Sequence, residues 1–313
     1  MTRTLASAFL LFTPVGLAAA GDDGIDKDWV ARDRAMVARL ASFLSPGDGS
    51  AKAWIEAVKP PTTKSEAGMT DDKPPSSERE DRDNRDVGGG ARRVVFDLGG
   101  GYLSAQVDAL VREDRVVEVD VRCPTTGGSD TKEAATAITD AWGKVPVVKD
   151  ENGFRYAWFD DVRRKAHRAA LVKEFGLRGE ASVPDVLRKE LDLLDGALSD
   201  LLYGRSFSED GGPPPGRTAL ETLVKAGAAG ALRALLRSPN PEGRVYALEG
   251  LERLAKEGEA LTDADRAAIA AIKASPVPIH DCSGCLVSTD TAAEALRKQR
   301  EEDETMRDAA RGK

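Results

Sequence analysis

The residues best suited to chemistry lie in one short segment, His280-Asp281-Cys282-Ser283-Gly284-Cys285. Two cysteines separated by two residues can form a redox pair, half of a zinc site or a structural disulfide. A zinc site would use His280, Cys282 and Cys285, and it needs Cys123 or a carboxylate as a fourth ligand. A thioredoxin-like pair needs a strand before it and a helix after it, whereas helices are expected on both sides. The pattern therefore favours a structural role, and we assign no metal, no cofactor and no catalytic residue.

The chain has three cysteines, Cys123, Cys282 and Cys285, which are the candidates for a disulfide bond. A bridge across only two intervening residues constrains the unfolded chain weakly and is often strained. Cys123 could equally pair with either of the other two. In an oxidising compartment we expect at least one of Cys282 and Cys285 to be bridged and the remaining thiol to be buried and inert.

The two histidines limit any histidine-dependent catalysis. His280 adjoins the cysteines, and His167 stands in the basic run 163–168, which is typical of a solvated surface near a turn. No Ser-His-Asp set can be assembled from these two histidines. The adjacent acids Asp160 and Asp161 would point to opposite faces of a strand, so they do not make an acid–base pair.

The N-terminal residues predict export. Arg3 gives a positive start, residues 6–18 are uncharged and mostly apolar, and Ala18-Ala19-Ala20 supplies the small residues of a cleavage site. This is the pattern of a secretory signal peptide, and the apolar run is too short to span a membrane. We therefore expect residues 1–20 to be removed, and the mature chain to start at Gly21 in the periplasm or the medium.

Composition narrows the range of partners. The chain carries 53 acidic and 45 basic residues, a net charge of −8, and no long basic stripe. Nucleic acid is therefore a poor candidate partner. After signal cleavage no further apolar run is long enough to span a membrane, which leaves a protein or a cell-envelope component as the expected partner.

The elements that must position these residues fall into several parts. Residues 21–58 have helical spacing, with apolar positions such as Trp29, Met36 and Phe43. Residues 59–93 are rich in Pro, Ser, Asp, Glu and Lys, which predicts a disordered linker because too little apolar surface is available to offset ordering entropy.

Residues 94–175 predict a small α+β module. Strands are expected over 94–96, 103–111, 116–121 and 154–159, with Glu113-Asp114 as a hairpin turn, and a helix over 131–142. For residues 166–172 a return strand is favoured over a helix. The aromatic residues could stack a sugar or peptide, but at strand spacing a core role is favoured, because a module of this size needs large side chains. They are Trp142, Phe154, Tyr156, Trp158 and Phe159.

The segment Val95-Phe96-Asp97-Leu98-Gly99-Gly100-Gly101 resembles a phosphate-binding motif of the heat-shock chaperone and actin-like ATPases. That resemblance implies an Asp directed toward a metal and glycines that let backbone amides approach phosphate. The ATPase fold also needs a second phosphate loop in an earlier subdomain, where this chain has a polar linker and a lone helical segment. We therefore interpret Asp97 as a turn residue at a strand end.

Residues 183–313 predict an α-helical domain. Helices are expected over 186–202, 218–236, 242–256, 263–273 and 292–307, with the first one ended by Gly204. Residues 238–251, beginning Ser238-Pro239-Asn240-Pro241, resemble the inter-helix turn and second helix of HEAT-like repeats, as in exported bacterial proteins. That resemblance implies stacked helix pairs with one face left for partners, and it carries no reaction with it.

Together these patterns predict an exported binding or structural protein that uses a helical-repeat surface for partner contact. The alternative is a thiol- or metal-dependent enzyme centred on Cys282 and Cys285. The two hypotheses differ in the state of the cysteines: an inert bridge supports the first, and free reactive or metal-bound thiols support the second.

Overall fold

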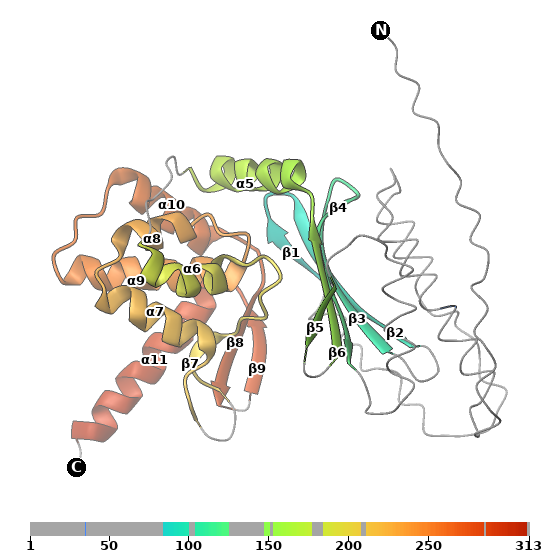
Figure 1. Cartoon of the computed structure of the whole chain (residues 1–313). Coiled ribbons are helices and arrows are strands. Elements are labelled where there is room, and N and C mark those ends of the chain that lie inside the picture. Colours follow the sequence, from blue (N-terminus) through green and yellow to red (C-terminus); the bar gives the residue numbers. More distant parts are fainter. Residues whose placement is uncertain are drawn as a thin grey trace, which may run out of the picture.

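A computed structural model describes residue 35 and residues 84–99, 104–124, 147–150, 153–176, 184–207, 211–284 and 286–311. Within these residues an antiparallel sheet stands beside a mainly helical unit, and one helix, α5, runs across the top of both (Figure 1). The predicted signal peptide and the helix over 131–142 lie outside the described residues, as does the helical segment 21–58 apart from residue 35. Among the residues described, no helix is both long and apolar enough to cross a membrane.

The larger sheet has six strands in the order β1-β2-β3-β4-β6-β5, all antiparallel to their neighbours. The strands are β1 (Arg85–Gly88), β2 (Ala91–Gly99), β3 (Ser104–Arg112), β4 (Arg115–Pro124), β5 (Val147–Asp150) and β6 (Gly153–Phe159). The predicted hairpin between β3 and β4 is confirmed. Its turn residues Glu113 and Asp114 have φ values of 51° and 60°, the left-handed conformation that matches the twist of a two-residue hairpin.

Two expectations near the start of this sheet are wrong. The predicted linker does not extend to Arg93, because β1 and the first residues of β2 lie within it. Composition misled because the charges of this segment are paired: Arg85 binds Glu242 and Arg93 binds Asp108. Asp97 is not a turn residue either, since it lies inside β2 opposite Gln106 of β3.

The expected return strand over 166–172 is instead part of helix α5 (Asp161–Phe175). Asp160 caps its N-terminus by accepting a hydrogen bond from the backbone of Arg163, and Gly176 ends it in the left-handed conformation at φ 71°. His167, Leu171 and Phe175 are its buried residues. Their spacing of four residues places them on one helix face, so the helical period prevails over the strand interpretation.

The second unit is mainly helical and contains a three-stranded sheet. Its elements are η1 (Asp185–Leu187), α6 (Arg188–Asp195), β7 (Tyr203–Phe207), α7 (Pro215–Lys225), α8 (Ala229–Leu235), α9 (Pro241–Lys256), α10 (Asp263–Ala274), β8 (Ile279–Gly284), β9 (Leu286–Asp290) and α11 (Ala292–Arg311). Strand β8 pairs with β7 in parallel and with β9 antiparallel. The expected α+β class is confirmed, and the helices over 242–256 and 263–273 match α9 and α10.

Three local expectations in this unit are corrected. The helix expected over 186–202 is only the short η1 and α6, and Gly204 lies in β7. The helix expected over 218–236 is divided into α7 and α8 near Gly227, which has φ 62°. Strands, rather than the helices expected on both sides, adjoin the cysteine segment: His280 and Cys282 lie in β8, which ends at Gly284 with φ 58°, and β9 follows from Leu286.

The two units share one core. Helix α9 lies at its centre, with Val245, Tyr246 and Leu248 fully buried, and Leu171 and Phe175 of α5 belong to the same apolar cluster. A second cluster joins the sheet to the segment that follows α6: Val87, Ala91, Leu110, Val117, Ala197 and Leu198. The α+β module and the helical unit therefore pack against one another through apolar contacts.

Candidate functional site

One face of the larger sheet carries charged side chains in successive rows. Along β4, Val119 and Val121 are buried, whereas the alternate residues are the charged Glu118, Asp120 and Arg122. Residues two apart in a strand share a face, so the three charged side chains lie together. On the neighbouring strand β6, the residues opposite Glu118, Asp120 and Arg122 are Phe159, Ala157 and Arg155, respectively. The face therefore presents carboxylates and guanidinium groups side by side.

Asp120 is the centre of this face. Its carboxylate is only 4% exposed and accepts hydrogen bonds from two arginines. Arg155 donates from Nε to Oδ1 at 2.9 Å and to Oδ2 at 3.1 Å, and Arg122 donates from Nη2 to Oδ2 at 3.2 Å. The two arginine side chains are 54% and 50% exposed. One buried carboxylate thus orients two half-exposed cations.

A second, buried pair lies on the neighbouring strands. Arg93 of β2 donates two hydrogen bonds to Asp108 of β3, from Nε at 2.9 Å and from Nη2 at 2.5 Å. Burial raises the pKa of Asp108, and the hydrogen bonds from Arg93 oppose that rise. Asp108 stands opposite Asp120 in the register of β3 and β4. Arg93 also donates to the carbonyl oxygen of Leu198 at 3.5 Å, which ties this face to the segment after α6.

A groove of about 380 Å³ lies between this sheet face and that segment. Its sheet side includes Glu118, Asp120, Arg122, Arg155, Ala157 and Phe159, and its opposite side includes Leu193, Gly196, Leu198, Ser199 and Asp200. The volume falls within the usual range of small ligand sites, about 300–1,000 Å³. The groove joins a charged floor to a wall that is apolar at Leu193 and Leu198 and charged at Asp200.

Phe159 is the exposed aromatic residue at the end of this floor, with 46% of its surface accessible. The guanidinium of Arg164 lies 4.2 Å above its ring, and Arg164 also pairs with Glu118 at 3.4 Å. Burial raises the pKa of Glu118, while Arg164 lowers it. The cation over the ring occupies one face of Phe159, so that face is closed to a stacking sugar ring.

A different cluster of buried charges holds β1 against the helical unit. Arg85 and Glu242 form a bidentate pair at 2.5 and 2.8 Å, and the backbone N–H of His280 donates to the same carboxylate at 2.8 Å. Burial alone would raise the pKa of Glu242, but the charge and hydrogen bonds of Arg85 lower it. Arg244 donates to the carbonyl oxygen of Val87 at 3.0 Å. These contacts position the sheet against the helical unit.

The two histidines lie in this junction. His167 is buried, contrary to the expected solvated surface, and its Nε2 lies 3.0 Å from the carbonyl oxygen of Gly88. The basic run misled because its arginines Arg163, Arg164 and Arg168 are half-buried in ion pairs with Asp160, Glu118 and Asp195 rather than fully solvated. His280 is also buried, and its Nε2 has no hydrogen-bond partner within the part of the chain that the structure describes. Burial lowers the pKa of each histidine to about 4.

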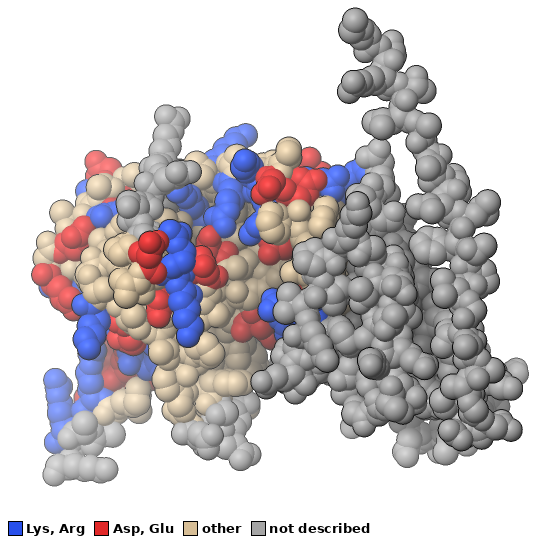
Figure 2. All heavy atoms as spheres, viewed as in Figure 1, with Lys and Arg blue, Asp and Glu red and all other residues tan. Residues whose placement is uncertain are grey.

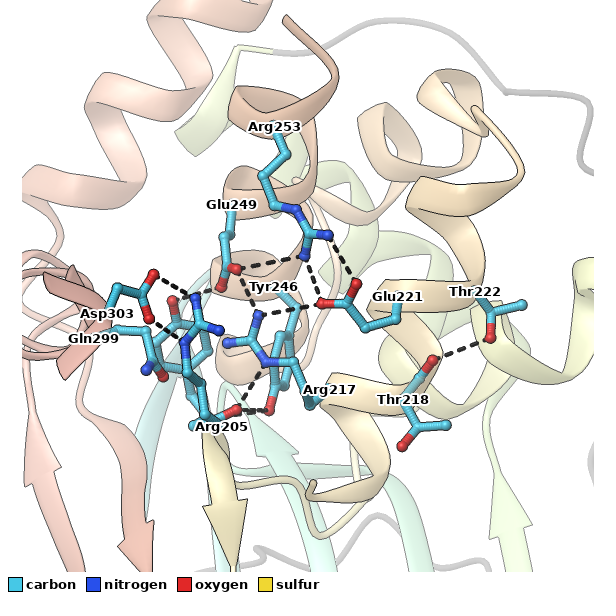
Figure 3. Close-up of polar contacts among 12 residues, drawn as sticks. Arg205, Arg217, Thr218, Glu221, Thr222, Tyr246, Glu249, Arg253, Gln299 and Asp303 are labelled. Atoms are coloured by element: carbon cyan, nitrogen blue, oxygen red, sulfur yellow. Dashed lines mark hydrogen bonds and ion pairs between the residues drawn. The ribbon is translucent and has the colours of Figure 1, made fainter. Parts of the chain in front are cut away.

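A third polar network ties β7 to three helices (Figure 3). Arg217 of α7 lies at its centre and donates to Glu249 at 2.5 Å and to the carbonyl oxygen of Gly204 at 2.9 Å. The hydroxyl of Tyr203 donates to the other oxygen of Glu249 at 2.8 Å. Arg205 of β7 pairs with Asp303 of α11. Burial raises the pKa of Tyr203, so its hydroxyl stays protonated and acts as a structural donor.

The cysteine segment does not assemble a metal centre among the described residues, where no group of three His, Cys, Asp or Glu side chains gathers. Cys282 is a free, buried thiol, and burial raises its pKa to about 11. The reactive thiolate is therefore scarce at neutral pH. Cys123 lies in β4, but its side chain and the whole of Cys285 lie outside the described residues, so a bridge between those two stays a prediction.

Ser288 and Lys298 lie near this segment and have the spacing of a serine–lysine pair. Lys298 Nζ is 3.1 Å from Ser288 Oγ, and it also pairs with Asp290. The hydrogen bond to Asp290 raises the pKa of Lys298. A charged ammonium cannot accept the hydroxyl proton, so this contact does not activate Ser288 as a nucleophile.

The groove and the buried pairs are the sites that reasoning from the sequence missed. The alternation of valine with charged residues in 116–121 indicated a charged strand face, but nothing in the chain revealed what stands opposite it. Figure 2 shows acidic and basic side chains interspersed over the described part of the visible face.

No family model, no curated protein and no solved structure matches the chain.

Proposed function

We propose that this protein is an exported, non-catalytic binding protein that holds an extended polypeptide segment in the groove between the sheet and the segment after α6. The observation that carries the proposal is the groove itself, in which half-exposed arginines and Phe159 face an apolar wall. Arginine and aromatic residues are enriched at protein–protein interfaces, and apolar walls provide affinity that polar groups then orient.

A polypeptide suits this groove better than a carbohydrate does. The cation of Arg164 already covers one face of the Phe159 ring, which reduces the aromatic surface open to a stacking sugar. A polypeptide can place an apolar side chain against Leu193 and Leu198 and a polar one over the charged floor. The HEAT-like helical surface predicted from residues 238–251 remains a further partner surface within this proposal, and none of those residues lines the groove.

The thiol-enzyme alternative has less support. A buried thiol whose pKa is raised to about 11 is a poor nucleophile. Export of the chain is tested by sequencing the N-terminus of secreted material. A start within a few residues of Gly21 is expected, and retention of residues 1–20 would contradict export by a cleaved signal peptide.

Selection from a displayed library of random heptapeptides tests the binding function. The groove is blocked by Ala157→Trp, an exposed alanine on its floor, and the matched control is Ala270→Trp on the exposed side of α10. We expect the selected peptides to bind the wild type and the control alike and to lose binding to Ala157→Trp. Peptides that bind all three equally, or a library that yields no binder, would contradict the proposal.

A further inference from the structure

His167 of α5 holds the turn that joins β1 to β2. The ring is almost fully buried, and its Nε2 lies 3.0 Å from the carbonyl oxygen of Gly88. Because a carbonyl oxygen only accepts hydrogen bonds, the ring donates from Nε2. The ring also packs tightly against the turn, since a Cβ built on Gly89 would lie 2.8 Å from His167 Cδ2. The histidine therefore fastens this turn to the helix by a hydrogen bond and by close packing.

The other end of β1 is held by a different kind of contact. Arg85 forms the buried bidentate pair with Glu242 of α9. Burial raises the pKa of Glu242, but the charge and hydrogen bonds of Arg85 outweigh this effect and lower it overall. The carboxylate therefore stays ionised in mild acid, and the pair keeps the start of β1 in place. One end of this four-residue edge strand is thus insensitive to mild acid, whereas the other end depends on a histidine.

Three arginines surround the ring of His167 from three elements. Burial is the largest cause that lowers the pKa of His167, and the charges of Arg244 of α9, Arg112 of β3 and Arg168 of α5 lower it further. Burial also lowers the pKa of Arg244, to about 10, which still leaves its guanidinium charged at neutral and acid pH. A proton on His167 therefore adds a positive charge to a buried site that already faces three.

Two acidic groups near the ring also bond to the turn. Glu174 of α5 accepts the backbone N–H of Gly89 at 2.6 Å, and Asp86 accepts that of Gly88 at 2.8 Å. These carboxylates act on the same turn as His167, so a test must separate the histidine from them. Other charged groups on the elements packed against α5 are paired with one another: Glu118 with Arg164, Asp195 with Arg168, Asp265 with Arg233, Asp263 with Arg266 and Glu252 with Lys273.

We propose that His167 is an acid-sensitive latch, which releases the turn 87–91 from α5 when its ring is protonated, while the Arg85–Glu242 pair holds the start of β1. In the docked state the pKa of His167 is about 4, and in the released, solvated state it returns toward 6.5. Release therefore takes up a proton. Docking of the turn is complete above about pH 6.5 and weakens as pH falls toward 4.

Release of the turn also changes the groove. Val87 and Ala91 pack with Ala197 and Leu198 in the second apolar cluster, and Leu198 lines the groove. When the turn moves away, these two residues lose part of their packing, so acid loosens one wall of the groove. The latch goes beyond the proposed function, and its action does not depend on a bound ligand.

Hydrogen exchange of the full mature chain, read by mass spectrometry at pH 7.5 and pH 4.5, tests the latch. Rates are corrected for the intrinsic effect of pH and expressed as protection factors. We expect the protection of residues 87–92 to fall at least about tenfold at pH 4.5. Strand β8 should keep its protection, because the N–H of His280 donates to Glu242 in the pair that stays closed. An equal loss in β8 and α9 would mean global unfolding and would overturn the proposal.

Variants assign the effect to one histidine. In His167→Gln the amide can donate to the same carbonyl oxygen without taking up a proton, so the protection of residues 87–92 should change by less than about twofold between the two pH values. The matched control is His280→Gln. His280 is also buried, but its Nε2 bonds to nothing in the described part of the chain, so this variant should still release the turn. The reverse pattern, or an undiminished loss in His167→Gln, would overturn the latch and assign the response to other groups.

A second measurement decides the matter if His167→Gln does not fold. The chain has two histidines, so the one ring signal left in the nuclear magnetic resonance spectrum of untagged His280→Gln belongs to His167. We expect this signal to titrate well below pH 6.5 and together with the loss of protection in residues 87–92. Titration near pH 6.5 while the turn stays protected would show that the ring takes up its proton without releasing the turn, and the latch would be wrong.

Discussion

Arg85 and Glu242, 157 residues apart in the chain, form a bidentate ion pair that fastens the edge strand β1 to the first turn of α9. Both side chains are almost fully buried. The carboxylate lies at the N-terminus of α9, where the helix dipole favours negative charge, and it also accepts the N–H of His280. One residue of the helical unit therefore binds the first strand of the sheet and β8 together.

Removing one partner of this pair should destabilise the fold strongly. Glu242→Gln leaves Arg85 buried without its counter-charge, and loss of one member of a buried pair costs about 3–5 kcal/mol. Urea unfolding of the mature chain measures the change. The control is Glu221→Gln, which breaks the exposed pair with Arg253 and should cost about 0–1 kcal/mol. Similar losses for the two variants would show that the buried pair does not fasten the units.

Stability should fall in mild acid because of the two buried histidines. The pKa of His167 and that of His280 are each about 4 in the folded protein, against 6.5 for an unperturbed histidine. Between these values the unfolded chain binds more protons than the folded chain does. The stabilisation is thus complete above about pH 6.5 and is lost as pH falls toward 4, by as much as about 3 kcal/mol for each histidine.

Urea midpoints at pH 7.5 and pH 4.5 measure this loss, and comparison with His167→Gln and His280→Gln isolates each histidine. Each variant should show a smaller difference between the two pH values than the wild type does. The comparison is needed because the pKa values of Asp108 and Glu118 are raised in the folded protein. These two carboxyl groups therefore stabilise the fold as pH falls, which opposes the effect of the histidines. An unchanged difference in both variants would contradict the assignment to histidine.

The sequence predicts best where local signals and the final contacts agree. The turn at Glu113-Asp114 and the helix α9 were both predicted, because turn chemistry and apolar period operate within a few residues. Gly204 shows the opposite case. It resembles a helix end in the sequence, but it lies in β7 against Cys282, far along the chain. The ion pair of Arg85 and the burial of His167 likewise depend on residues far away in the chain, which a local sequence pattern does not reveal.

The groove was beyond sequence reasoning for the same physical reason. The alternating valines of β4 indicate which residues share a face, since strand geometry fixes that. The opposite wall at Leu198 and Asp200 belongs to a segment that was predicted to be helical. Only the packing of the two units brings these parts together and places Arg122 and Arg155 beside an apolar wall.

Gly204 should not tolerate a side chain. A Cβ at this position would lie 2.3 Å from the backbone oxygen of Cys282 and 2.6 Å from its Sγ. Gly204→Ala must therefore separate β7 from β8, and overpacking of this kind costs about 1–3 kcal/mol. Gly212→Ala is the matched control, because no atom lies within 4 Å of a Cβ built there. Thermal unfolding measures both, and equal stability of the two variants would contradict the close contact.

The thiol of Cys282 should react slowly in the folded protein. It is buried beside Gly204, and the same burial raises its pKa to about 11, so little thiolate exists at pH 7.5 and that little is shielded. Treatment with iodoacetamide, followed by peptide mass mapping, should find Cys282 unmodified in the native chain and modified once the chain is unfolded in urea. Rapid native labelling of Cys282 would instead favour a functional thiol, and it would revive the enzyme alternative for the segment that contains His280 and Cys285.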